Sequence, residues 1–354
     1  MPTGSERQKF RLTASAIAAH TKHRCDRLFR WQTVPALLRG QAGIGWNVPK
    51  RERAASRPAI RLLMAGGDEF ELNQVCDLIA SVGEDRFVSA GEVTENGRTQ
   101  VTELPLETFL ATLHAPILPA FIAQVAINLT SDPESERAFL AHFDLDADAL
   151  QLGPARPDLI QIIDPPHPGD PYCLRIWDFK ASRVARHDHF IQEAYYSLLL
   201  EHVLAWANMT NIQVDVETAI IRSRKGDEVF ELQPYRRAVS DFLRNRAMPL
   251  LSTPAVDAHY HVCDHCITCE YADHCRAEAD AGTDLSRIAY ISSESKRRLK
   301  QAGILTYREL ARIATGSDAA TQLSTLRELS HDLTVHGVRY LASAQALEDG
   351  RVRR

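Results

Sequence analysis

Two aspartates and a lysine occupy positions where a short β-hairpin would bring them together. Asp158 opens the apolar run DLIQIID, and the run YCLRIWDFK ends with Asp178, Phe179 and Lys180. The runs enclose PPHPGDP, a stretch of turn-forming residues, and residues 158 and 178 are equidistant from Pro168. In a simple antiparallel register Asp158 lies opposite Asp178, and Lys180 points the same way two residues further on. The sequence therefore predicts that these three charged side chains converge.

Such a convergence is suited to metal-assisted cleavage of phosphodiesters. Two neighbouring carboxylates repel each other unless a cation lies between them, and Mg²⁺ or Mn²⁺ prefers oxygen ligands. The Phe179 carbonyl is a candidate third ligand, and the Lys180 ammonium would position a water or stabilise developing charge. The alternative is that Asp158 starts a strand while Asp178 and Lys180 are solvated surface charges. A register slip of one residue would separate the three.

A second group of reactive side chains is the segment CDHCITCEYADHC, residues 263–275, which holds four of the seven cysteines. In a reducing compartment such a cluster favours metal binding over disulfides. Taken alone, the spacing favours a structural zinc site, for which His261, His265 and His274 widen the choice of ligands, but it also suits a 4Fe–4S cluster. Of the other cysteines, we expect Cys76 and Cys173 to be small core residues in a helix and a strand.

Hydrophobic periodicity and turn residues predict the elements that must position these side chains. The polar, acidic stretch 129–154 indicates a surface insertion, residues 41–58 indicate a loop, and residues 83–117 indicate strands and turns. We expect helices over 13–30 (with Thr13 or Ser15 as N-cap), 69–82, 188–209 and 237–251, strands over 120–128, 158–164 and 172–179, two strands around Lys225-Gly226-Asp227, and helices from residue 284 onward.

The composition of the 354-residue chain is that of a globular protein, with 45% hydrophobic and 25% charged residues. The net charge of −5 does not favour nucleic-acid binding by itself, although a local basic patch is compatible with it. The first residues contain no apolar signal-peptide core, and the apolar run 195–209 is too short and too polar to span a bilayer. We therefore expect a cytoplasmic protein that does not associate with a membrane.

The order of these motifs resembles the RecB-like branch of the PD-(D/E)XK nuclease superfamily. Asp158, Asp178-Phe179-Lys180 and then Gln192-x-x-x-Tyr196 follow the order of that branch. Taken alone, the last pair indicates only a half-exposed helix face. Cys25 together with Cys266-x₂-Cys269-x₅-Cys275 is similar to the layout of its members with a 4Fe–4S cluster, such as AddB-type nuclease domains and CRISPR-associated exonucleases.

The resemblance covers residues 13–315 and implies a restriction-endonuclease-like α/β fold, in which helices flank a mixed central sheet. It implies a nuclease domain over 1–282 with an iron–sulfur clip, and a helical segment with a helix-hairpin-helix over 283–354. It also implies an acidic residue on an earlier helix, for which Glu71 in Gly67-x-x-x-Glu71 is the candidate, although Glu69 is nearby. The chain departs from the family pattern before the first aspartate, where Ala155-Arg156-Pro157 stands in place of a glycine.

The resemblance also implies a role for each residue. Asp158, Asp178 and the Phe179 carbonyl would bind Mg²⁺ or Mn²⁺, Lys180 would position the water, and Glu71 would assist at the metal. Gln192 and Tyr196 would brace the site or touch the substrate. The cluster ligands would be Cys25, Cys266, Cys269 and Cys275, with Cys263 left out and zinc as the alternative.

The function implied is metal-dependent cleavage of DNA, on single strands or ends, with a helicase module or subunit as a further partner. One alternative is a non-catalytic DNA-binding or scaffold module of a helicase or defence complex. Another is a zinc-stapled protein without nuclease activity, in which Asp158 and Lys180 do not converge.

The C-terminal segment predicts a pair of short helices over 295–301 and 307–315, the second with a capping box between Thr306 and Glu309. Basic residues gather here, and beside helix N-termini they favour contact with a DNA backbone. The alternative is a helical hairpin that packs on the core. The basic residues are Lys296, Arg297, Arg298, Lys300 and Arg308.

Overall fold

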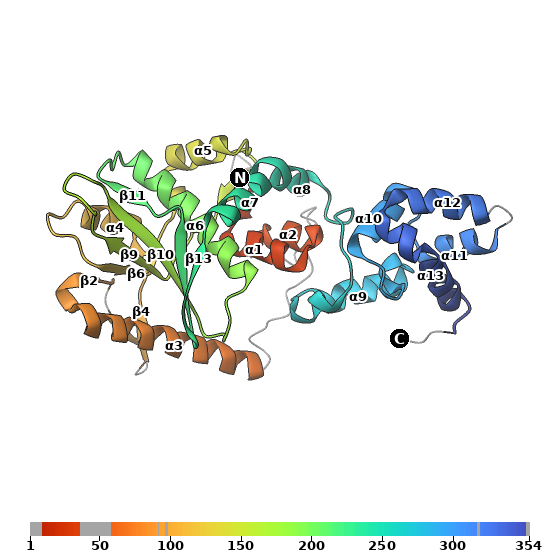
Figure 1. The fold of residues 1–354 in the computed structure, drawn as a ribbon, viewed down its shortest axis with the longest axis horizontal. Helices are drawn as coiled ribbons and strands as arrows, with labels where there is room; N and C mark the ends of the chain where they lie inside the picture. The colour runs from red at the N-terminus through yellow and green to blue at the C-terminus, as the bar shows by residue number, and fades with distance from the viewer. Residues whose placement is uncertain (1–8, 36–57, 91, 96–97, 317–318, 352–354) are drawn as a thin grey trace, which may run out of the picture. The chain divides into compact units, whose positions relative to one another are not determined.

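The structure is a computed structural model, and it describes residues 9–35, 58–90, 92–95, 98–316 and 319–351. These residues pack as two compact units, each described by itself (Figure 1). The first contains residues 9–24, 29–35 and 58–255, and the second contains residues 25–28 and 256–351. The loop predicted over 41–58 lies outside the described residues up to position 57.

A mixed seven-stranded sheet forms the centre of the described part of the first unit (Figure 1). It consists of β2 (Phe87–Val88), β6 (Phe121–Ala123), β9 (Leu159–Ile163), β10 (Tyr172–Lys180), β11 (Ile212–Val214), β12 (Thr218–Ser223) and β13 (Gly226–Glu231). The strand order is β13-β12-β10-β9-β6-β2, with β11 paired to β10. Strand β10 is antiparallel to β9 and parallel to β12, which confirms the predicted hairpin.

Helices cover both faces of this sheet (Figure 1). On one face α6 (His187–Trp206) packs on β10 and β11 and against α1 (Ala14–His23). On the other face α3 (Pro58–Val82) packs on β10. The prediction of an α/β protein whose mixed central sheet is flanked by helices is therefore confirmed.

Alternation along β10 decides which of its side chains meet which helix. Leu174 and Ile176 belong to the core cluster that contains the apolar side chains of α6. Trp177 and Phe179 belong to a second cluster, which contains Val75 and Leu78 of α3. Because successive side chains on a strand point to opposite faces, Asp178 and Lys180 emerge on the α6 face.

Left-handed residues interrupt two of the predicted elements. Arg24 has φ 47° and ends α1, so the helix predicted over 13–30 is two helices, the second being α2 (Asp26–Gln32). Thr13 is the N-cap of α1, and its hydroxyl accepts a hydrogen bond from the Ala16 N–H at 3.1 Å. Gln124 has φ 52° and divides the strand predicted over 120–128 into β6 and β7 (Val125–Ala126).

Two expectations about burial are wrong. The stretch 129–154 is not a surface insertion, because its helix α5 (Pro133–His142) buries Phe139 and Leu140 in the main core. Its polar residues are spaced so that the apolar face of this amphipathic helix packs inward. Cys76 is exposed on α3 and is therefore not a core residue, while Cys173 on β10 is half-buried.

The second unit is helical and has its own apolar core around Leu285, Leu299, Leu310 and Tyr340. The capping box between Thr306 and Glu309 is present, as predicted. The sequence predicts a domain boundary after residue 282, and this boundary stays a prediction. The chain passes from the first compact unit to the second after residue 255. The helices are α9 (Ala272–Ala281), α10 (Ser293–Gln301), α11 (Tyr307–Thr315), α12 (Ala319–Leu329) and α13 (His331–Glu348).

The remaining elements of the first unit lie around the central sheet. None of the helices among the described residues has the length and apolar character needed to cross a membrane. The elements that lie around the central sheet are β1 (Phe10–Leu12), β3 (Glu92–Glu95), β4 (Arg98–Val101), β5 (Leu104–Pro105), α4 (Leu106–Leu113), β8 (Leu150–Leu152), α7 (Gln233–Phe242), a π-helical turn (Leu243–Ala247) and α8 (Met248–Ser252).

Candidate active site

The register of the β9–β10 hairpin is the one that the sequence predicts. Trp177 pairs with Leu159, so Asp158, one residue before β9, falls opposite Asp178. Lys180 Nζ lies 2.5 Å from Asp178 Oδ2. The Phe179 N–H donates a hydrogen bond to Asp158 Oδ2 over 2.7 Å. The predicted convergence of the two aspartates and the lysine is therefore present in the structure.

The charge of Asp178 affects the protonation of Asp158. Asp178 is only 2% exposed. Burial, and then the neighbouring charge of Asp178, raises the pKa of the Asp158 carboxyl well above its usual value. Burial disfavours a charged Lys180, but the charges of Asp178 and Asp158 outweigh it and raise the pKa of its ammonium. The lysine is therefore a cation at neutral pH and a hydrogen-bond donor in the described site.

A third carboxylate, Glu193, completes the group and was not singled out in the sequence. It lies on α6, is fully buried, and neither of its carboxylate oxygens has a hydrogen-bond partner among the described residues. Burial, followed by the charge of Asp178, raises its pKa well above the usual value. The available sequence signal was a glutamate in the apolar stretch of a helix that faces the hairpin. Glu193 lies three residues before Tyr196, so the two residues share a helix face.

The two predicted residues of α6 are placed differently. Tyr196 is 9% exposed, and burial, followed by the charges of Asp178 and Glu193, raises the pKa of its phenol well above the usual value. Its hydroxyl therefore borders the carboxylates. Gln192 is half-buried, and no contact described in the structure ties it to this group.

Glu71 reaches the edge of the same group. Its carboxylate accepts a hydrogen bond from the Gln124 side chain, and its charge is a lesser cause of the raised pKa of Asp158. The backbone N–H of Gln124 donates to the Asp158 carbonyl at 2.9 Å. The left-handed turn at Gln124 thus links Glu71 of α3 to Asp158. Glu69, the adjacent candidate, is exposed.

A hard divalent cation fits the charge of this site. Lys180 faces Asp158, Asp178 and Glu193, and the nearby His189 is held neutral because burial, and then the Lys180 charge, lowers its pKa to about 4. The carboxylate Glu193, buried without a partner, calls for a cation or a proton. Among the described residues no three His, Cys, Asp or Glu side chains form a ready-made metal site. Mg²⁺ needs only one or two carboxylates and keeps several waters.

Five of the seven cysteines lie in the second unit. Cys25 precedes α2, and its Sγ accepts a hydrogen bond from the Leu28 N–H at 3.4 Å. Burial, and then the neighbouring thiols of Cys275, Cys269 and Cys266, raises the pKa of Cys25 to about 12. Cysteines some 240 positions apart in the sequence are therefore close enough to affect one another's charge.

Cys263 also belongs to this group of thiols. A hydrogen bond between the side chains of Cys263 and Cys266 is the main cause that lowers the pKa of Cys266 to about 6. Thiolates are ligands for zinc or for an iron–sulfur cluster. The described residues contain no three thiols already arranged to hold a metal ion. Which four cysteines bind, and which of the two groups they hold, stays a prediction.

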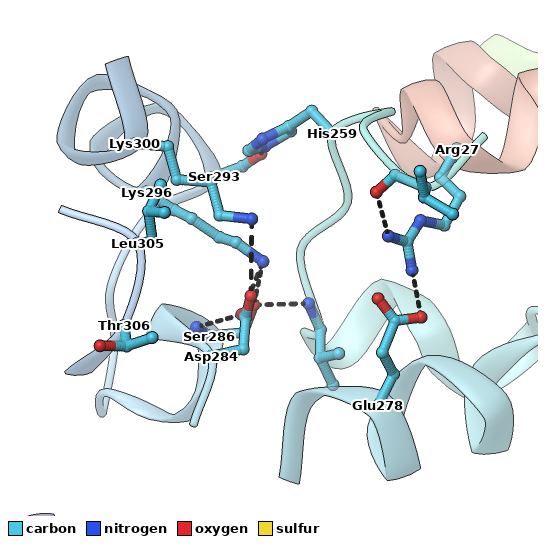
Figure 2. Close-up of polar contacts among 12 residues, drawn as sticks. Arg27, His259, Glu278, Asp284, Ser286, Ser293, Lys296, Lys300, Leu305 and Thr306 are labelled. Atoms are coloured by element: carbon cyan, nitrogen blue, oxygen red, sulfur yellow. Dashed lines mark hydrogen bonds and ion pairs between the residues drawn. The ribbon is translucent and has the colours of Figure 1, made fainter. Parts of the chain in front are cut away.

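Polar contacts hold residues 25–28 in the second unit (Figure 2). The Arg27 guanidinium forms an ion pair with Glu278 at 2.7 Å and lies over the Tyr260 ring, 3.7 Å from its centroid. Arg297 forms an ion pair with Asp26 at 3.0 Å. Glu278 is on α9, the helix that carries Cys275, so these contacts bring Cys25 to the cysteine segment.

One basic residue of the C-terminal segment, Lys296, is not placed for the phosphate contact considered above. Lys296 is fully buried and pairs with Asp284 at 2.6 Å (Figure 2), so it is unavailable to DNA. Local hydrophobic patterning could not reveal this pairing, since Asp284 lies outside the helix. The other four residues also have acidic partners, namely Asp26 for Arg297, Glu294 for Arg298, Asp284 for Lys300 and Glu348 for Arg308.

No protein-family model matches this chain, and no curated protein matches it closely enough to count as a relative. The resemblance to RecB-like nucleases therefore stays a prediction, based on the residues named above.

We expect the buried charge of Glu193 to make stability depend on pH. Because its pKa is raised in the folded state, the wild type loses free energy of unfolding as the pH rises above the unfolded value of about 4.3. In a chelator, Glu193→Gln should be more stable than the wild type at about pH 8, with no difference near pH 4. Urea unfolding measures this difference. Glu228→Gln, exposed on β13, is the matched control, and equal stability of Glu193→Gln and wild type throughout would contradict the burial of a charged group.

We expect the anaerobically purified protein to be brown and to contain iron. Substituting serine at Cys25, Cys269 or Cys275 should abolish the visible absorption and the bound iron, because each change removes a thiolate ligand. Cys76→Ser and Cys173→Ser are controls and should keep both. A colourless wild type that binds one zinc ion would contradict the iron–sulfur assignment.

Proposed function

We propose that this protein is a Mg²⁺- or Mn²⁺-dependent nuclease that hydrolyses DNA phosphodiester bonds. The observation that supports it best is the convergence of Asp158, Asp178 and Lys180 beside the unpartnered carboxylate Glu193. Two carboxylates next to a lysine are a common requirement for metal-assisted hydrolysis of phosphate esters. The resemblance to RecB-like nucleases makes single strands or DNA ends the expected substrate.

Asp158 and Asp178 are the residues that would hold the cation, with the Phe179 carbonyl as a further ligand. When bound, the cation supplies Lewis acidity and acidifies a coordinated water. The Asp158 carboxylate is kept in place by the Phe179 N–H, and the Asp178 carboxylate by Lys180. The chain therefore fixes both ligands through neighbouring groups of β10.

Lys180 acts as a charged hydrogen-bond donor in this proposal. Its raised pKa keeps the ammonium charged, so it is suited to orient the attacking water and to stabilise negative charge on the phosphate. Tyr196 likewise keeps its proton at the border of the site. Glu71, fixed by Gln124, orients a ligand from the α3 side. A brace by Gln192 rests on the resemblance alone.

The cysteine cluster has a structural role in this proposal. A bound metal or cluster would link Cys25 to the segment 263–275 and so fix residues 25–28 within the second unit. Closing a loop of this length by a metal clip constrains the unfolded chain strongly.

We expect the wild type to cleave fluorescently labelled single-stranded DNA in the presence of Mn²⁺. Lys180→Ala should reduce the rate by about 10²- to 10³-fold, because it removes a charged donor that acts on the transition state. Gel electrophoresis of the products measures both rates. Lys225→Ala, which removes an exposed lysine from the turn between β12 and β13, is the matched control.

Two results would refute the nuclease assignment. One is a wild type that does not cleave single-stranded or duplex DNA with Mn²⁺. The other is equal cleavage by the wild type and Lys180→Ala, which would indicate a contaminating nuclease. Binding of DNA without cleavage would favour the non-catalytic DNA-binding module instead.

A further inference from the structure

A pocket of about 500 Å³ opens within the second unit, between residues 261–264 and 286–291. This volume falls in the range of small-ligand sites, about 300–1,000 Å³. Its lining combines ionic, polar and aromatic side chains with four aliphatic ones, and it includes Cys263 of the thiol group described above. Those that bear on its chemistry are Asp264, Arg276, Ser286 and Tyr290.

Tyr290 is the most unusual residue of the pocket. Its side chain is 78% exposed, and its φ of 62° puts a bulky residue in the left-handed region. Such a conformation is strained for tyrosine, and it persists only where the surroundings impose it. The buried Tyr340 of α13 donates a hydrogen bond to the Tyr290 carbonyl at 3.1 Å, and the Ala289 N–H donates to Ser343 at 3.1 Å. These contacts from α13 thus hold the strained backbone of Tyr290 in place while the residue is exposed to solvent.

One face of the Tyr290 ring is already covered by a cation. The guanidinium carbon of Arg339 lies 4.6 Å from the ring centroid. Tyr290 is nevertheless 78% exposed, so most of the residue remains accessible to a planar ligand. An aromatic ring with an arginine beside it is a stacking platform that accepts any nucleobase and attracts its phosphate.

Buried polar contacts make the pocket wall rigid (Figure 2). Lys296 donates to Asp284 at 2.6 Å and to Ser286 at 2.9 Å, and all three residues are buried. The Ser286 hydroxyl oxygen also accepts the Val262 N–H at 3.2 Å, which joins the two segments that form the pocket. A pocket held in this way loses little conformational freedom on binding.

We propose that this pocket binds an unpaired nucleobase of single-stranded DNA, stacked on Tyr290, with Arg276 and Arg339 near the adjoining phosphates. Arg276 lines the pocket and is half-exposed, and it forms an ion pair with Asp273 at 3.3 Å. The Asp264 carboxylate on the same lining is an acceptor for the amino group of a base. The choice of DNA over other ligands with planar rings rests on the proposed nuclease function.

The test is binding of a single-stranded oligonucleotide that contains 2-aminopurine, measured by anisotropy and by fluorescence quenching in a chelator. The full-length wild type should bind and quench the probe, since stacking on an aromatic ring quenches this base. Tyr290→Ala should weaken binding at least about fivefold and remove the quenching. Tyr290→Phe should retain both. Leu305→Ala, an exposed residue that is not part of the pocket lining, should behave as the wild type.

Three results would overturn this site: no binding of the oligonucleotide by the wild type, equal binding and quenching by Tyr290→Ala, or equally tight binding of a duplex. The assay contains no divalent cation, so its outcome does not depend on cleavage. Cleavage of the same oligonucleotide is measured separately with Mn²⁺, so a wild type that quenches the probe without cleaving it would count against the nuclease assignment and not against this site.

Discussion

The excess of buried negative charge around Lys180 is the constraint on which the candidate active site depends. The Lys180 ammonium lies 2.5 Å from Asp178 Oδ2. The same group also contains Asp158 and Glu193, whose carboxylate oxygens have no hydrogen-bond partner among the described residues. An uncompensated buried charge costs several kcal/mol, so this group must take up protons or bind a cation. A site that served stability alone would not need a third carboxylate. This excess of acidic groups over cations is the physical reason for proposing a catalytic role for the site around Lys180.

The second unit shows the contrasting arrangement. Lys296 is fully buried, yet its ammonium donates hydrogen bonds to both Asp284 and Ser286. That network fixes the backbone around residues 262 and 286, whereas the network around Lys180 leaves acidic oxygens without partners. The two lysines thus differ in the balance between their own charge and the charge of their acidic partners.

Local sequence rules predicted the part of the site that a single hairpin builds. Turn residues between two apolar runs determined the register, and the register brought Asp158 to Asp178. The same rules missed Glu193, because its role depends on which face of α6 packs on β10. They misplaced Lys296, whose partner lies twelve residues earlier, and Cys76, since α3 exposes that face. The stretch 129–154 was misread because acidic composition hides the apolar face of α5. Contacts between distant segments decided each of these outcomes.

The most direct test of the account is the binding of Mn²⁺ to the metal-free protein, followed by electron paramagnetic resonance and calorimetry. The account predicts binding by the wild type that is lost in Asp158→Asn and Asp178→Asn, while Asp227→Asn, an exposed aspartate on β13, binds as the wild type. If the wild type binds no Mn²⁺, or if the two substitutions leave binding unchanged, the charge excess around Lys180 is met by protons alone. The proposed catalytic role of this group would then be wrong.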